Sequence, residues 1–151
     1  MNPSEQLVSQ VVVPRFCLPN VEKERGEILR VAHEFGATNP DSFANLFIEG
    51  SKGVELVPLD ADTWLKLENT DSFDIQPGDW ENVEHHSVLG HPDHPRDWQN
   101  LKHLMEEGAE IDAPIIYQNE DSFHLVSGNT RLMVARALGK VPQVLIVKIN
   151  S

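Results

Sequence analysis

Apolar residues in the first fifty positions recur at helical spacing. After an N-terminal arm, the pattern predicts a helix over residues 21–35, with Asn20 as its cap and Gly36 at its end. The apolar residues on one side of this helix are Val21, Ile28, Leu29, Ala32 and Phe35. A turn signal at residues 39–42 then leads into a short apolar segment at 43–47, which Gly50 ends.

The middle of the chain mixes short patterns with a long stretch that has none. Residues 54–58 alternate like a strand, and Asp60 is placed to cap a short helix. Residues 69–92 show no clear period. Pro95 is expected to be the first residue of the next helix, because its missing N–H costs nothing there. That helix is predicted to end at Gly108 and to bury Trp98, Leu101, Leu104 and Met105.

The last forty residues carry the clearest pattern. Residues 113–118 and 123–126 predict two strands joined by a short turn, which indicates a hairpin. Residues 127–129 then break the chain, and a helix is predicted over 130–138. Residues 144–147 predict a final buried strand. Strand, turn, helix and strand in this order favour an α/β or α+β domain.

The junction between the second strand and the helix offers a site for an anion. It consists of Ser127, Gly128, Asn129, Thr130 and Arg131. The first turn of a helix leaves backbone N–H groups unpaired and carries about half a positive charge. Gly128 permits close approach of a ligand to the backbone, and short polar side chains flank it. The junction is therefore predicted to bind a phosphate.

Arg131 strengthens this prediction. A cation in the first turn is repelled by the positive end of the helix dipole, which destabilises the helix by ~0.3–1 kcal/mol. A bound anion would reverse the sign, since arginine can clamp phosphate oxygens with two N–H groups. Arg136, farther along the helix, and His124, on the preceding strand, are second-rank candidates. In the alternative interpretation, Ser127 or Asn129 is an ordinary N-cap and Arg131 points into solvent.

Residues 98–149, about a third of the chain, resemble the ParB N-terminal domain, which is also found in sulfiredoxin and the free serine kinases. The matching pieces are residues 101–108, 115–116, 124–126, 127–131, 135–139 and 141–142. Residues 54–59 also look like the family's opening strand. The resemblance implies one α+β domain over 1–151, with a small mixed sheet packed with helices. Its core would span 54–151, and residues 1–50 would add extra N-terminal helices.

In that family the glycine turn and the helix N-terminus hold nucleotide phosphates, and Gly128 and Arg131 carry over by position. Asn129 stands where ParB has a glutamate that aids CTP hydrolysis, and where sulfiredoxins have a nucleophilic cysteine. Asparagine is neither a general base nor a thiol nucleophile. The resemblance therefore implies binding of a nucleotide or nucleic-acid phosphate at residues 127–131. A stand-alone ParB-like protein of the nuclease type would add metal-dependent nuclease or nucleotide-hydrolase activity.

Histidines and acidic residues gather just before the predicted helix at residue 98. The set comprises Glu84, His85, His86, His91, Asp93, His94 and Asp97. Imidazole and carboxylate ligands suit transition metals, and a nuclease uses a metal to polarise phosphate or activate water. His91, Asp93 and His94 are the candidate ligands of a divalent metal, Mg or Zn. A solvated polar loop is the alternative, and the same residues are also candidates for the general base that Asn129 cannot be.

Charge is distributed unevenly along the chain, whose formal net charge is −12. Residues 41–121 hold nineteen acidic and four basic residues, whereas residues 122–151 hold four basic and no acidic residues. The total argues against broad DNA binding, because phosphate attraction needs clustered lysine and arginine. The acid-free segment still permits one bound phosphate. A second hypothesis is that the acidic segment imitates DNA and binds a basic partner protein, with the fold as a scaffold.

Cys17 is the only cysteine, so an intramolecular disulfide is excluded and a reducing compartment is favoured. We expect it to act as a small hydrophobic residue. The longest apolar runs, 11–13 and 144–147, are far shorter than the ~20 residues that span a bilayer. The N-terminus shows no signal-peptide pattern. We therefore expect a cytoplasmic protein with no membrane partner.

Overall fold

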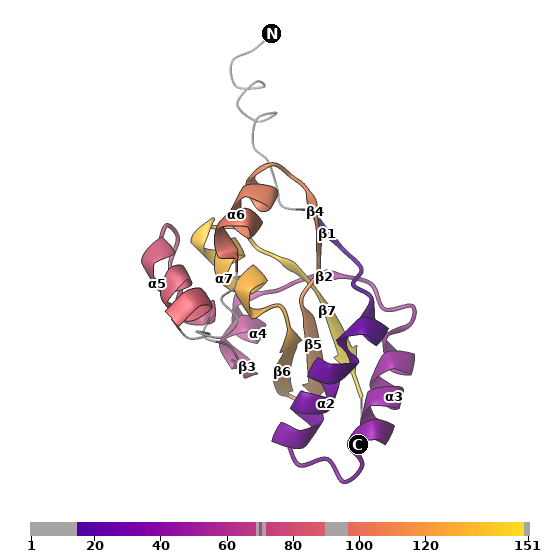
Figure 1. Cartoon of the computed structure of the whole chain (residues 1–151). Coiled ribbons are helices and arrows are strands. Elements are labelled where there is room, and N and C mark those ends of the chain that lie inside the picture. The colour runs from indigo at the N-terminus through magenta and orange to yellow at the C-terminus, as the bar shows by residue number, and fades with distance from the viewer. Residues whose placement is uncertain (1–14, 69, 71, 90–96, 150–151) are drawn as a thin grey trace.

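The computed structural model describes residues 15–68, 70, 72–89 and 97–149 (Figure 1). The larger of its two sheets is mixed and has the strand order β2-β7-β5-β6-β3. These strands are β2 (Val57–Pro58), β3 (Leu67–Glu68), β5 (Ile115–Asn119), β6 (Ser122–Ser127) and β7 (Gln143–Lys148). A smaller parallel ribbon pairs β1 (Arg15–Cys17) with β4 (Glu110–Asp112). The predicted α+β class is confirmed.

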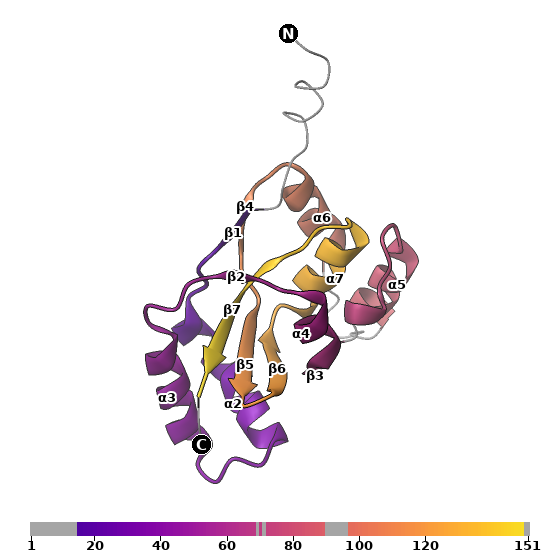
Figure 2. The same ribbon diagram turned by 180° about the vertical axis from the view of Figure 1, so that it is seen from behind.

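Helices cover both faces of the larger sheet (Figures 1 and 2). The α-helices are α2 (Arg25–Glu34), α3 (Pro40–Ser51), α4 (Ala61–Lys66), α5 (Trp80–Glu84), α6 (Trp98–Glu106) and α7 (Asn129–Ala137). Shorter helical turns span Val21–Glu24, Ser72–Asp74 and His85–Leu89. Helices α2 and α3 lie on one face and α4 and α7 on the other, while α5 and α6 pack against α7.

The alternation of side chains along the strands produces these two layers. On β5, Tyr117 packs with α2 and α3, whereas its neighbour Ile116 packs with α4 and α7. On β6, Val126 and Leu125 divide in the same way. Successive side chains of a strand point to opposite faces, so a strand covered on both sides needs apolar residues at consecutive positions.

The C-terminal hairpin and crossover follow the prediction closely. Strands β5 and β6 pair antiparallel, and β7 then lies parallel to β5 on its other side, so the chain crosses over through α7. The predicted helix 130–138 and strand 144–147 correspond to Asn129–Ala137 and Gln143–Lys148. These elements are long enough for their apolar periods to be read without ambiguity.

Three details differ from the prediction. The helix predicted over 21–35 is divided into a 3-10 turn (Val21–Glu24) and α2, although Asn20 does cap its start. The strand predicted over 54–58 is reduced to Val57–Pro58. The strands β1, β3 and β4 were not predicted, since each has only two or three residues and exists through its pairing partner.

Helix α6 spans Trp98–Glu106, and Pro95, the predicted first residue of this helix, lies outside the described residues. Asp97 has a non-helical backbone and its Oδ1 accepts a hydrogen bond from the Asn100 N–H at 3.1 Å. A side-chain cap of this kind satisfies one of the unpaired N–H groups of the first turn. The predicted buried side of this helix is confirmed: Trp98 and Met105 are buried, and Leu101 and Leu104 are partly buried.

Candidate functional site

Gly128 occupies the turn between β6 and α7 and is the N-cap of the helix. Its φ of 108° lies in the left-handed region, and no side chain of the described residues caps the helix. A Cβ atom at this position would lie 2.7 Å from Pro114 Cβ and 2.9 Å from Pro114 Cα. Glycine is therefore required here for backbone conformation and for packing against Pro114. The alternative interpretation, in which Ser127 or Asn129 caps the helix, is wrong on this point.

An open groove of about 790 Å³ lies beside this turn. Its floor is formed by the end of β6 and the first turn of α7, from Leu125 to Arg131. One wall comes from the start of α2 and the turn before it, and the other from the first half of α6. The wall residues are Glu24, Glu27 and Arg30 on one side and Asp97, Asn100, Leu101 and Leu104 on the other. The structure thus gathers all five predicted residues, 127–131, on one groove.

Arg131 does not point freely into solvent, which corrects the alternative interpretation. Its Nη1 donates hydrogen bonds to the backbone oxygens of Asp112 at 2.5 Å and Ala113 at 3.5 Å. Burial lowers the pKa of Arg131, while the negative charges of Glu24 and Asp112 act in the opposite direction. The guanidinium therefore anchors the bend between β4 and β5 and also borders the groove.

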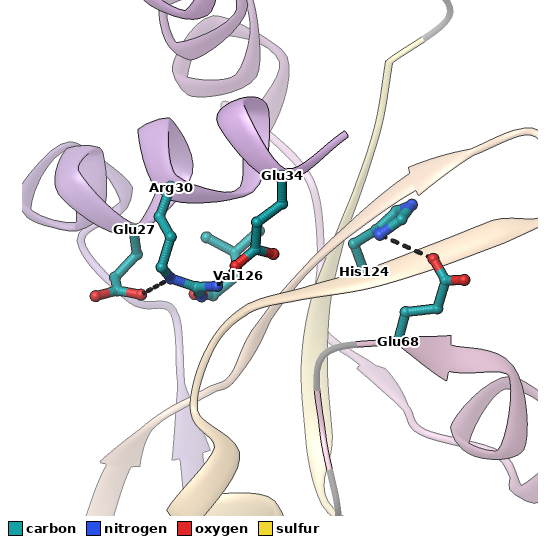
Figure 3. A network of polar contacts seen from close by, with 6 residues as sticks. All are labelled: Glu27, Arg30, Glu34, Glu68, His124 and Val126. Atoms are coloured by element: carbon teal, nitrogen blue, oxygen red, sulfur yellow. Dashed lines mark hydrogen bonds and ion pairs between the residues drawn. The ribbon is translucent and has the colours of Figure 1, made fainter. Parts of the chain in front are cut away.

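Arg30 is the second cation at the groove (Figure 3). Its guanidinium lies 2.9 Å from Glu27 Oε2 and 2.8 Å from Glu34 Oε1, and its Nη2 donates to the backbone oxygen of Val126 at 3.2 Å. Partial burial opposes its charge, but the hydrogen bonds with Glu27 and Glu34 raise the pKa of Arg30 overall. This network ties α2 to the end of β6, so it fixes one wall of the groove to the floor.

Asn129 is tied to the segment that follows β3. Its Oδ1 accepts a hydrogen bond from the hydroxyl of Thr70 at 2.5 Å. The hydroxyls of Thr70 and Ser72 are hydrogen-bonded at 2.7 Å, and the indole N–H of Trp64 donates to Ser72 Oγ at 2.8 Å. The amide oxygen of Asn129 thus serves a structural network that begins in α4. Ser127 differs, because its Oγ is buried and has no hydrogen-bond partner in the described part of the chain.

The two second-rank candidates lie away from the groove. Arg136 donates through Nε to the backbone oxygen of Ile75 at 2.6 Å, and its guanidinium stacks on Trp64 and Phe73. His124 lies farther back along β6, where its Nδ1 is 3.0 Å from Glu68 Oε2 and its ring stacks on Tyr117 (Figure 3). Both side chains hold neighbouring elements together, and neither lines the groove.

The proposed metal ligands His91, Asp93 and His94 lie outside the described residues. Within the described ranges, no group of three His, Cys, Asp or Glu side chains is arranged to hold a metal ion. Among the described members of the same predicted set, Asp97 is the one that lines the groove, opposite Glu24 and Glu27.

The remaining charged wall residues were not predicted from the sequence. Glu24, Glu27 and Arg30 stand about one hundred positions before the glycine turn, and nothing in their spacing indicates a ligand. Their i, i+3 relation within a helical stretch is typical of a solvated helix face. Only the packing of α2 beside the end of β6 brings them to the groove.

Cys17 lies on β1 with its Sγ 3.5 Å from Asp112 Oδ1. Burial, and then the hydrogen bond and charge of Asp112, raise the pKa of this thiol. A raised pKa lowers the thiolate fraction, so Cys17 is poorly suited to be a nucleophile.

Comparisons with known proteins supply no relative. No family model, no curated protein and no solved structure matches the chain. Among the described residues, no helix combines the length and apolar character needed to cross a bilayer.

Proposed function

We propose that this protein binds a phosphorylated small molecule, such as a nucleotide, in the groove at the start of α7. The observation that carries the proposal is that an uncapped helix N-terminus, with residues 127–131, forms the floor of an open groove bordered by Arg131 and Arg30. Unpaired N–H groups and the positive end of the helix dipole favour an anion there. A volume of about 790 Å³ falls within the range of small-molecule sites.

Each residue of the turn has a defined part in this proposal. The N–H groups of Asn129, Thr130 and Arg131 and the hydroxyl of Thr130 would contact the phosphate oxygens. Arg131 would balance the charge with the nitrogens that its carbonyl contacts leave available. Gly128 shapes the turn. The buried Ser127 hydroxyl lacks a partner in the described residues, and it would reach the phosphate only if the turn changed its conformation. The resemblance to the ParB and sulfiredoxin domains implies a phosphate site at the same residues. The protein would act in the cytoplasm.

Nuclease or nucleotide-hydrolase activity is not part of this proposal. Such an activity would need a general base, and Asn129 cannot act as one. A metal-dependent activity would need His91, Asp93 and His94, which lie outside the described residues. Binding is therefore the function that the geometry supports best.

An NMR titration of the full chain tests the proposal. Inorganic phosphate, AMP, ATP, CTP and a short DNA oligonucleotide are added in turn, with and without Mg²⁺. We expect the amide signals of Thr130 and Arg131 to shift with at least one phosphate, while those of Gly139 and Lys140, past the other end of α7, stay in place. If every one of these ligands leaves Thr130 and Arg131 unmoved, the proposal is wrong. The acidic interaction role is then the remaining hypothesis.

A further inference from the structure

The charged side chains that line the groove indicate how many phosphate groups its ligand carries. This inference rests on the proposed function, binding of a phosphorylated small molecule. The groove is lined by three carboxylates, Glu24, Glu27 and Asp97, and by two guanidinium groups, Arg30 and Arg131. Its lining side chains therefore carry a net charge of −1, in a site that is proposed to hold an anion.

Both arginines are already partly neutralised by their neighbours. Arg30 is ion-paired with Glu27 and also with Glu34, which lies outside the groove lining. Arg131 interacts with the charge of Glu24 and donates to two backbone oxygens. The positive potential that remains comes mainly from the first turn of α7, which is equivalent to about half an elementary charge. Such a field suits one phosphate group, and each further phosphate would approach the carboxylates of the walls.

The rest of the lining indicates what accompanies that phosphate. Leu101 and Leu104 of α6, which are partly buried, provide an apolar surface for a ring. A carboxylate accepts hydrogen bonds and cannot donate them, so Glu24, Glu27 and Asp97 favour a ligand that carries hydrogen-bond donors. Oδ1 of Asp97 accepts the hydrogen bond that caps α6, and Oδ2 would be the atom that accepts from a ligand.

We propose that the groove selects a nucleoside monophosphate whose ring carries hydrogen-bond donors, and that it disfavours triphosphates and nucleic acids. The single phosphate sits at Thr130 and Arg131, the ring packs on the leucines, and the ring donors meet the wall carboxylates. The wall carboxylates thus act as specificity determinants that exclude polyanions by repulsion, in the way that unfavourable contacts commonly set specificity.

The test measures affinities of the full chain by calorimetry in EDTA and again in Mg²⁺. AMP is expected to bind at least tenfold more tightly than ATP in both buffers. It is also expected to bind at least threefold more tightly than purine riboside monophosphate, which has the same ring size but no ring donor. ATP binding as tightly as AMP in either buffer, or equal affinity for the two monophosphates, would overturn the inference.

A variant with the three wall carboxylates neutralised isolates the cause. The changes are Glu24→Gln, Glu27→Gln and Asp97→Asn, and asparagine preserves the cap of α6. We expect the preference for AMP over ATP to fall at least tenfold. The control carries Glu55→Gln, just before β2, and Glu81→Gln on α5, which are exposed and lie away from the groove, and it should keep the preference. An unchanged ratio in the triple variant would contradict the inference.

The two proposals fail in different ways. If inorganic phosphate and AMP both leave Thr130 and Arg131 unmoved, the groove is not a phosphate site and both proposals are wrong. If phosphate binds there but ATP is preferred to AMP, phosphate binding stands and only the monophosphate selectivity is wrong.

Discussion

The two ends of α7 carry similar residues and are used differently. At the start of the helix, Gly128 and Arg131 border an open groove. At the other end, Arg136 is enclosed between Trp64 and Phe73, and Gly139 is exposed. Each end thus has a glycine and an arginine in the sequence, but of these four residues only Gly128 and Arg131 line the groove.

The difference shows that an arginine near a helix end is defined by what packs around it. Arg136 lies on the side of α7 that faces α4 and the Ser72–Asp74 turn, where two aromatic rings and the Ile75 carbonyl occupy its planar group. Arg131 also donates to backbone oxygens, but it does so at the edge of a groove that α2 and α6 leave unfilled.

The largest effect is expected for Gly128→Ala. The left-handed backbone costs an alanine ~1–2 kcal/mol, and the clash of its Cβ with Pro114 at 2.7 Å adds overpacking of ~1–3 kcal/mol. Urea unfolding should show a loss of about 3 kcal/mol. Gly139→Ala is the matched control, because its φ is 70° but its Cβ would lie 3.9 Å from the nearest atom, Pro77 Cβ. Its loss should be about 1 kcal/mol, and equal losses at both glycines would contradict the role given to Pro114.

The second prediction compares the same substitution at both arginines. Arg136→Met removes the stacking on two rings and a charged hydrogen bond, so the free energy of unfolding should fall by about 2 kcal/mol. Its affinity for AMP should stay within twofold of the wild type. Arg131→Met should lower that affinity at least tenfold, beyond its own cost in stability. Calorimetry and urea titration of both variants check this, and an equal loss of affinity in the two would remove the distinction between the ends of the helix.

A smaller effect is expected for the network that joins the start of α7 to the residues after β3. Thr70→Val removes the hydroxyl that donates to Asn129 Oδ1, which should cost about 1 kcal/mol. Because the two side chains act through one hydrogen bond, Asn129→Ala in the Thr70→Val background should cost less than it does alone. A double-mutant cycle in urea measures this coupling. A coupling energy of zero would show that the contact contributes nothing to stability.

The smallest effect concerns pH and the elements around the closed end of α7. The backbone N–H of Thr63 holds the pKa of Asp60 below its usual value, and the side chain of Asn82 does the same for Asp79. These residues cap α4 and α5. A pKa that is lower in the folded chain stabilises the fold above the unfolded value of about 3.9, and this contribution is lost as the pH falls below it.

Replacing both caps by asparagine keeps the capping geometry and removes the titration. We therefore expect the doubly substituted chain, Asp60→Asn with Asp79→Asn, to lose less stability than the wild type between pH 5 and about pH 3. Urea midpoints at the two values measure the difference. A wild-type loss no larger than that of the variant would show that neither cap contributes through its charge.

Local pattern was sufficient wherever an element buries apolar residues at a regular period. The β5–β6 hairpin, α7 and β7 were predicted because their alternating or consecutive apolar residues are explained by one structure. The same reasoning found Asn20 and Asp60 as helix caps, since a capping side chain bonds to an N–H only three residues away. It failed for β1, β3 and β4, whose two or three residues carry no period of their own.

The sequence by itself determined that the chain combines helices with a sheet, and it determined the position of the strand–glycine–helix turn at residues 127–131. Both are local properties, set by the spacing of apolar residues and by the unpaired N–H groups at a helix start. Only the tertiary structure decided that position 128 must lack a Cβ because Pro114 packs against it, and that Arg136 is enclosed by aromatic rings. It also decided that three carboxylates, Glu24, Glu27 and Asp97, line the groove beside the turn. These are contacts between elements far apart in the chain, and their free energy depends on distances that no local pattern contains.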